Sequence, residues 1–217
     1  MNFAKEIYNG KTEIKNIIFD WGGVITDLHL NATKRAFLEL GLSIFDESVP
    51  HDPRNDLFIS FEIGKITPNE FRNRIRSYSS SSLTDAAIDH AWNSLLGELP
   101  AERWHILQKA ARQFRTFLLS NTNAIHLSYY YGRIKQIYGT YGYAHLFEKT
   151  YFSFELGMRK PNIDIFQYVL KDAGIHPKET LFIDDFIENI QTARQIGFQT
   201  IHLKAPMTLA DVFTDLE

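Results

Sequence analysis

Short runs of β-branched and aromatic residues alternate with helix-like segments along most of this chain, and this alternation restricts the fold more than any other feature. Strands that alternate with helices indicate a parallel sheet with helices on both faces. We therefore predict an α/β fold. The strand-like runs are 14–19, 116–119, 179–183 and 198–203, and helical patterns occur at 103–112, 162–173 and 188–195.

The segment 31–99 has a different texture, with helical patterns and no strand of its own. Thr67, Pro68 and Glu70 form a typical helix start, and apolar residues recur at three-and-four spacing after Thr84. We interpret this segment as an all-helical module inserted between the first and second core strands. The predicted division is therefore a core of residues 1–30 and 100–217 and an inserted module of residues 31–99.

Composition narrows the classes of function. The chain has 217 residues, of which 44% are hydrophobic and 23% charged, as in an ordinary globular protein. A formal net charge of -3 provides no basic field for nucleic acid or an anionic membrane, and the lack of cysteine excludes thiol catalysis and zinc–thiolate sites. No apolar run approaches the roughly 18 residues that span a bilayer. We expect a cytoplasmic monomer or weak homodimer without nucleic-acid or membrane partners.

A tyrosine-rich segment, 124–150, has two interpretations. Tyrosine is amphipathic, so these side chains could wall a pocket or pack in the interior with loop hydrogen bonds. We favour packing with loop hydrogen bonds.

Polar side chains stand at the ends of three predicted strands. Asp20 follows the first, Ser120 and Asn121 end the second, and Asp184 and Asp185 follow the next. In a doubly wound sheet, ligands bind outside the carboxyl ends of the strands. We therefore expect these side chains to converge in space, although the sequence separates them.

This inventory suits chemistry on a phosphate group. Asp20 is the predicted nucleophile, since carboxylates form aspartyl-phosphates in some enzymes. Mg²⁺ would relieve the repulsion between that carboxylate and the phosphate, with Asp20, Asp184, Asp185 and the Gly22 carbonyl as its predicted ligands. Two adjacent carboxylates at a strand end repel each other, so a cation is the natural way to keep both ionised.

The remaining predicted site residues bind phosphate or support the others. Ser120 and the Asn121 amide can donate hydrogen bonds to phosphate oxygens, and Lys160 adds a point charge for phosphate and for Asp20. Asn189 lies four residues after Asp185, so one helical turn can return its amide to the site.

At these residues the chain resembles the haloacid dehalogenase-like hydrolase superfamily. Segments 20–25, 119–123, 156–161 and 183–190 look like its four motifs, and the second and third are similar to those of bacterial α-D-glucose-1-phosphate phosphatase-like members. The resemblance implies a Rossmann-like core with a helical cap, which corresponds to 31–99, and Mg²⁺ as cofactor. It also implies catalytic Asp20 and Lys160 and hydrolysis of a small phosphorylated metabolite, with sugar phosphates as the expected class.

One position departs from the pattern. Most family phosphatases carry a second Asp two residues after the nucleophile as general acid and base, and Gly22 stands there in this chain. General acid–base catalysis typically contributes about 10²–10⁴-fold, so we predict slow turnover or substrates with good leaving groups. Asp27 or a cap residue could substitute, but nothing in the sequence shows that either reaches the site.

Two alternatives remain beside the phosphatase. A haloacid dehalogenase also lacks the second Asp and needs no metal, but that branch lacks the acidic pair Asp184–Asp185. A catalytically degenerate protein that binds a phosphorylated ligand is the other, supported only by Gly22. Specificity would lie in the cap, whose polar candidates are His51, Arg54, Glu62, Arg72 and Arg76, although a solvated helix face explains most of them.

Overall fold

The protein contains one five-stranded parallel sheet, which confirms the predicted α/β fold. The computed structural model describes residues 13–42, 53–139, 143 and 145–213. The strand order is β3-β2-β1-β4-β5, and every neighbouring pair is parallel. The strands are β1 (Asn16–Phe19), β2 (Arg115–Ser120), β3 (Lys149–Phe152), β4 (Thr180–Asp184) and β5 (Gln199–His202).

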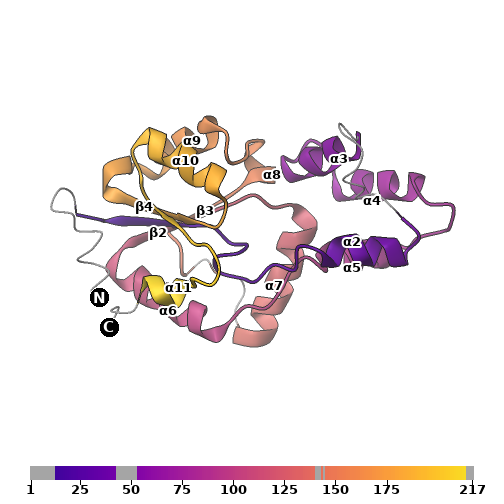
Figure 1. The fold of residues 1–217 in the computed structure, drawn as a ribbon, viewed down its shortest axis with the longest axis horizontal. Coiled ribbons are helices and arrows are strands. Elements are labelled where there is room, and N and C mark those ends of the chain that lie inside the picture. The colour runs from indigo at the N-terminus through magenta and orange to yellow at the C-terminus, as the bar shows by residue number, and fades with distance from the viewer. Residues whose placement is uncertain (1–12, 43–52, 140–142, 144, 214–217) are drawn as a thin grey trace.

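Helices cover both faces of the sheet (Figure 1). Alternate residues of β1 point to opposite faces, so Ile17 and Phe19 join one hydrophobic cluster and Ile18 joins the other. The first cluster is completed by α6 (Ala101–Gln113), α7 (Ala124–Tyr138) and α11 (Leu209–Val212). The second is completed by α9 (Ile163–Ala173) and α10 (Ile187–Ile196). Both faces of β1 are therefore buried, as its apolar sequence predicts.

Among the described residues between β1 and β2, four helices stand to one side of the sheet (Figure 1). They are α2 (Ala32–Glu39), α3 (Pro53–Glu62), α4 (Pro68–Ser77) and α5 (Asp85–Asn93). Thr67 and Glu70 form the predicted capping box at the start of α4. These helices have a hydrophobic cluster of their own, around Phe61 and Phe71, which Ile125 of α7 joins from the core. The exact division of the chain at residues 31 and 99 stays a prediction.

The tyrosine-rich segment is more regular than the sequence predicted. The chain forms the 15-residue helix α7 and the short strand β3 there, neither of which the sequence analysis predicted. Asn123 caps α7 by accepting a hydrogen bond from the His126 N–H, and Gly139 ends it. The packing interpretation is confirmed, because Tyr130 and Tyr143 are buried in the first cluster.

Two short elements connect the strands, α8 (Ser153–Leu156) after β3 and the 3₁₀ turn η1 (Pro177–Glu179) before β4. Within the described part of the chain, no helix combines the length and apolar character needed to cross a membrane.

Candidate active site

The central strand brings the acidic residues together. β1 lies between β2 and β4, and Phe19 is level with Ile183 of β4. The Asp20 N–H donates a hydrogen bond of 2.9 Å to the Ile183 carbonyl. Asp20 and Asp184 therefore stand side by side at the carboxyl edge, and Ser120 ends β2 on the other side of Asp20. After β1 the chain adds β2 and β3 on one side of this strand and then β4 and β5 on the other side. The carboxyl edge at β1 is therefore the topological switch point, where α/β sheets bind ligands.

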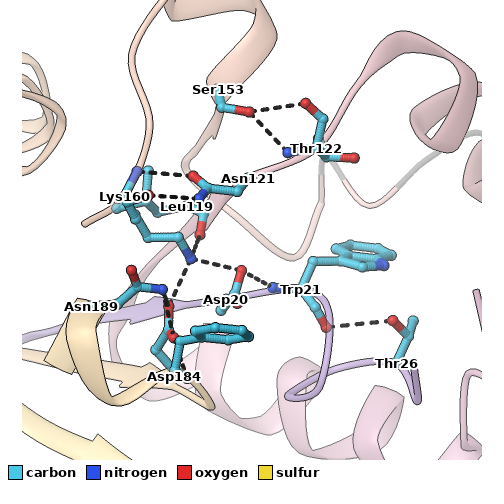
Figure 2. A network of polar contacts seen from close by, with 11 residues as sticks. Asp20, Trp21, Thr26, Leu119, Asn121, Thr122, Ser153, Lys160, Asp184 and Asn189 are labelled. Atoms are coloured by element: carbon cyan, nitrogen blue, oxygen red, sulfur yellow. Dashed lines mark hydrogen bonds and ion pairs between the residues drawn. The ribbon is translucent and has the colours of Figure 1, made fainter. Parts of the chain in front are cut away.

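Lys160 is a buried cation at this edge, with 1% of its side chain exposed. Its Nζ lies 2.8 Å from Asp20 Oδ1 and 2.7 Å from Asp184 Oδ2, and it donates to the Leu119 carbonyl at 2.8 Å (Figure 2). Burial alone would lower the pKa of Lys160, but the two carboxylates outweigh it and the net shift is upward. Lys160 therefore stays charged and links the first and fourth motifs.

Asn121 holds the backbone of Lys160. Its Nδ2 donates to the Lys160 carbonyl at 2.9 Å, and its Oδ1 accepts from the Lys160 N–H at 3.0 Å (Figure 2). Lys160 lies in a loop 39 positions after Asn121, and this pair of bonds fixes its backbone so that its ammonium group reaches the site. The sequence suggested instead that the Asn121 amide binds phosphate, but this amide is engaged with the backbone.

Asp184 is fully buried and surrounded by donors. Asn189 Nδ2 lies 2.9 Å and 3.0 Å from its two carboxylate oxygens, and the Phe186 N–H donates to Oδ1 at 2.8 Å. The turn of α10 thus returns the Asn189 amide to the site, as its spacing from Asp185 suggested. Together with Lys160, these donors hold the Asp184 carboxylate in one orientation.

Asp20, Asp184 and Asp185 form a group that suits a divalent cation. One carboxylate oxygen from each lies within 4.8 Å of the others. Burial raises the pKa of Asp20 well above its ordinary range, and Asp184 and Asp185 add to the shift while Lys160 opposes it. Burial and Asp184 also raise the pKa of Asp185 to about 6. One ammonium group, that of Lys160, faces three clustered carboxylates, so a further cation would stabilise their ionised forms. Mg²⁺ prefers hard oxygen ligands, so the donor set fits this ion.

Gly23 leaves room for one member of this group. Its φ of +73° lies in the left-handed region, and a Cβ added to it would come within 2.2 Å of Asp185 Oδ2. Only glycine therefore allows the loop after β1 to approach the Asp185 carboxylate this closely.

Replacement of Gly23 by Ala is expected to displace Asp185 and weaken Mg²⁺ binding by about 10–100-fold, as removal of groups that orient metal ligands usually does. Isothermal titration with Mg²⁺ measures the effect. Gly139→Ala is the control, because Gly139 also has a positive φ of 64° but has nothing within 4 Å of an added Cβ. Equal Mg²⁺ affinity in the two variants would contradict the role of Gly23.

The position of the missing second Asp is partly filled. A Cβ on Gly22 would lie 3.0 Å from Leu28 Cδ1, so Leu28 occupies the space beside it. Asp27 pairs with Arg103 of α6 at 2.8 Å and lies outside the set of described residues that line the pocket. Asp27 is therefore no substitute in this conformation.

A pocket of about 330 Å³ opens beside these groups, which is near the lower end of the range for small-molecule sites. It is lined by Asp20, Gly22, Leu28, Glu62, Asn121, Arg159, Lys160, Pro161, Asp185, Phe186, Glu188 and Asn189.

Of the cap residues suggested by the sequence, Glu62 is the one that the structure places at this pocket. Arg72 and Arg76 pair with Asp89 and Asp85 inside the helical module. The predictions for His51 and for the Arg54 side chain fall outside what the structure describes.

Ser153 is a residue that the sequence analysis missed. Its Oγ accepts from the Thr122 N–H at 2.9 Å (Figure 2) and donates to the Glu62 carbonyl at 2.6 Å. It therefore joins the loop after β2 to the last residue of α3. A serine outside the four motifs carries no signal for such a contact, which depends on residues 91 positions apart.

Comparison with known proteins agrees with this geometry. A family model for haloacid dehalogenase-like hydrolases matches residues 14–197. The D-ribitol-5-phosphate phosphatase of Bacteroides thetaiotaomicron is 32% identical over 189 residues, which cover 86% of this chain and 90% of that protein. The sesquiterpene phosphatase of Aspergillus oryzae is 26% identical over 196 residues, which cover 88% and 91%.

A solved structure is similar over nearly the same length. It is a haloacid dehalogenase family enzyme from Bacteroides thetaiotaomicron, the wild-type protein in complex with magnesium and inorganic phosphate. It is 37% identical, has a TM-score of 0.83, and covers 92% of this chain and 99% of its own. Because the family model spans most of the sequence and these relatives match almost end to end, the chain belongs to the haloacid dehalogenase-like hydrolases.

Proposed function

We propose that this protein is a Mg²⁺-dependent phosphatase of small phosphorylated metabolites. The observation that carries the proposal is the buried Lys160, which bridges Asp20 and Asp184 where Asp185 completes a cation-binding group beside a pocket. Relatives named as phosphatases of D-ribitol 5-phosphate and of a sesquiterpene support hydrolysis of phosphate monoesters. The pocket volume and its charged lining favour sugar or polyol phosphates as the class.

In the proposed reaction, the Asp20 carboxylate attacks phosphorus, the ester P–O bond breaks, and the departing alkoxide takes a proton from solvent. Water then attacks phosphorus of the aspartyl-phosphate, which releases inorganic phosphate and restores Asp20. Bound Mg²⁺, held by Asp20, Asp184, Asp185 and the Gly22 carbonyl, would offset the negative charge of the phosphoryl oxygens.

The other residues have positioning and binding roles in this proposal. Lys160 holds Asp20 in place, and its positive charge would stabilise the phosphoryl oxygens. Ser120 remains the predicted hydrogen-bond donor to these oxygens. Asn121 contributes by orienting Lys160, and Asn189 by orienting Asp184. Residues 31–99 act as a cap that covers the pocket through the end of α3.

The experiment that tests this function is phosphate release from a panel of sugar phosphates, polyol phosphates and an aryl phosphate, with Mg²⁺ and with a chelator. Release that requires Mg²⁺ is the expected result, and the rank order of substrates identifies the class. Gly22 cannot donate a proton to the leaving group. Aryl phosphate, whose leaving group needs little protonation, is therefore expected to turn over faster than the alkyl esters.

Two other functions fit less well. A haloacid dehalogenase needs no metal, whereas this chain gathers three carboxylates that suit one. A ligand-binding protein without turnover rests on Gly22 alone, and it would bind inorganic phosphate with Mg²⁺ yet release none from any ester. The cytoplasmic location and the monomeric or weakly dimeric state stay predictions.

A further inference from the structure

Glu62 reaches the pocket from the helical module and meets a core residue there. Glu62 is the last residue of α3, and Arg159 directly precedes Lys160 in the third motif. Glu62 Oε1 lies 2.8 Å from Arg159 Nε, and both side chains line the pocket that contains Asp20. They keep 28% and 32% of their side-chain surface exposed, so a molecule in the pocket can reach them.

This ion pair is incompletely hydrogen-bonded. Arg115 and Glu148 on the surface form two aligned hydrogen bonds of 2.8 Å and 2.6 Å. By contrast, Glu62 Oε1 and Arg159 Nε are buried atoms without a hydrogen-bond partner among the described residues, despite their short separation. Both atoms are shielded from solvent, so a ligand in the pocket can contact the exposed remainder of each side chain rather than these two atoms.

The position of Glu62 is set by the core rather than by the helix alone. Its carbonyl accepts the Ser153 hydrogen bond at 2.6 Å. Two residues later, Gly64 has a φ of +68°, and a Cβ there would lie 2.1 Å from the Phe154 carbonyl oxygen. The backbone around Glu62 therefore packs tightly against α8, which holds the carboxylate at the pocket.

Glu62 also belongs to the charge network of the site. Burial raises its pKa, while Arg159 and Lys160 act in the opposite direction. The field of the buried ammonium group that touches Asp20 therefore extends to Glu62. The pocket lining also includes the apolar residues Leu28, Pro161 and Phe186.

We propose that Glu62 and Arg159 recognise hydroxyl groups of the substrate and thereby select polyhydroxylated phosphates. A carboxylate accepts hydrogen bonds from hydroxyl groups, and a guanidinium group donates hydrogen bonds to their oxygens. The pair can therefore bind a hydroxyl group both as a donor and as an acceptor. Sites built to bond a hydroxyl discriminate strongly against analogues that lack it, because their own polar groups are then left unpaired. This assignment rests on the proposed phosphatase function.

A matched pair of substrates tests it, a pentitol phosphate and the straight-chain alkyl phosphate with the same number of carbons. We expect the wild type to prefer the pentitol phosphate in kcat/KM by about 10–100-fold, the usual scale for hydrogen bonds to charged groups. Glu62→Gln and Arg159→Gln should each reduce this preference, measured as the ratio of kcat/KM for the two substrates, to about 3-fold or less.

Glu98→Gln is the matched control. Glu98 pairs with Arg133 at the same 2.8 Å, but it is exposed and lies outside the set of described pocket-lining residues. Its variant should keep the full preference for the hydroxylated substrate. A thermal unfolding midpoint close to that of the wild type shows that each pocket variant is folded.

The other outcomes separate the hypotheses. An unchanged preference in both pocket variants would overturn the recognition role. Equal losses on both substrates would also overturn it, because Glu62 would then act on the reacting phosphoryl group or on cap position. Absence of phosphate release from either compound by the wild type would instead reject the proposed function, on which this assignment depends.

Discussion

Asp20→Asn is expected to reduce phosphate release by at least about 10³–10⁴-fold, the scale on which removal of a nucleophile acts. The reason is chemical, since an amide cannot attack phosphorus to form an aspartyl-phosphate. The fold should survive, because Asn has nearly the same volume and Lys160 keeps its contact with Asp184 at 2.7 Å. Steady-state release of phosphate from the best substrate of the panel measures the loss.

Asp27→Asn is the control for this change. Asp27 lies in the same loop and pairs with Arg103, but it is absent from the described lining of the pocket. Its variant is expected to keep activity within about 3-fold of the wild type, as for ordinary exposed ion pairs. Comparable losses in the two variants would mean that the loop, rather than the Asp20 carboxylate, is what activity requires.

Lys160→Met is expected to lower both stability and activity. It removes the buried cation between Asp20 and Asp184 and leaves two carboxylates without compensation. Breaking a buried ion pair on one side typically costs about 3–5 kcal/mol in the free energy of unfolding. Urea unfolding of the metal-free protein measures this cost, and activity should fall by about 10²–10³-fold, since a charge that stabilises the transferring oxygens is lost.

The matched control is Lys149→Met. Lys149 pairs with Asp172 at 3.0 Å, but both side chains are about 40% exposed. Exposed pairs contribute about 0–1 kcal/mol, so this variant should unfold near the wild type. If Lys160→Met unfolds no more easily than Lys149→Met, the buried bridge does not stabilise the site.

Asp20, Ser120 and Asp184 could be predicted because each one stands at the end of a strand. β1, β2 and β4 have apolar, β-branched sequences that are recognisable without a structure, and parallel strands present their carboxyl ends at one edge. Asp20, Ser120 and Asp184 therefore had to converge once the sheet was predicted. The helical module was predicted for a similar reason, since its capping box and apolar spacing are local signals.

Contacts between distant residues could not be predicted. The strand β3 was missed because it is a four-residue edge strand that begins with an exposed lysine, so its pattern is weak. Asn121 bonds to Lys160, and Glu62 pairs with Arg159. Neither pair is related by the periodicity of a helix or a strand, so the sequence gives no signal for the contact. The first pair follows from how two loops of the core pack together, and the second from how the helical module docks on the core.

The most direct test of the account is to quench the wild type with acid during turnover and to measure the mass of the peptide that contains Asp20. The account predicts that this peptide gains the mass of one phosphoryl group with Mg²⁺ present, and that Asp20→Asn never does. Normal phosphate release without phosphoryl transfer to Asp20 would contradict the central claim, because hydrolysis would then proceed without the carboxylate as nucleophile.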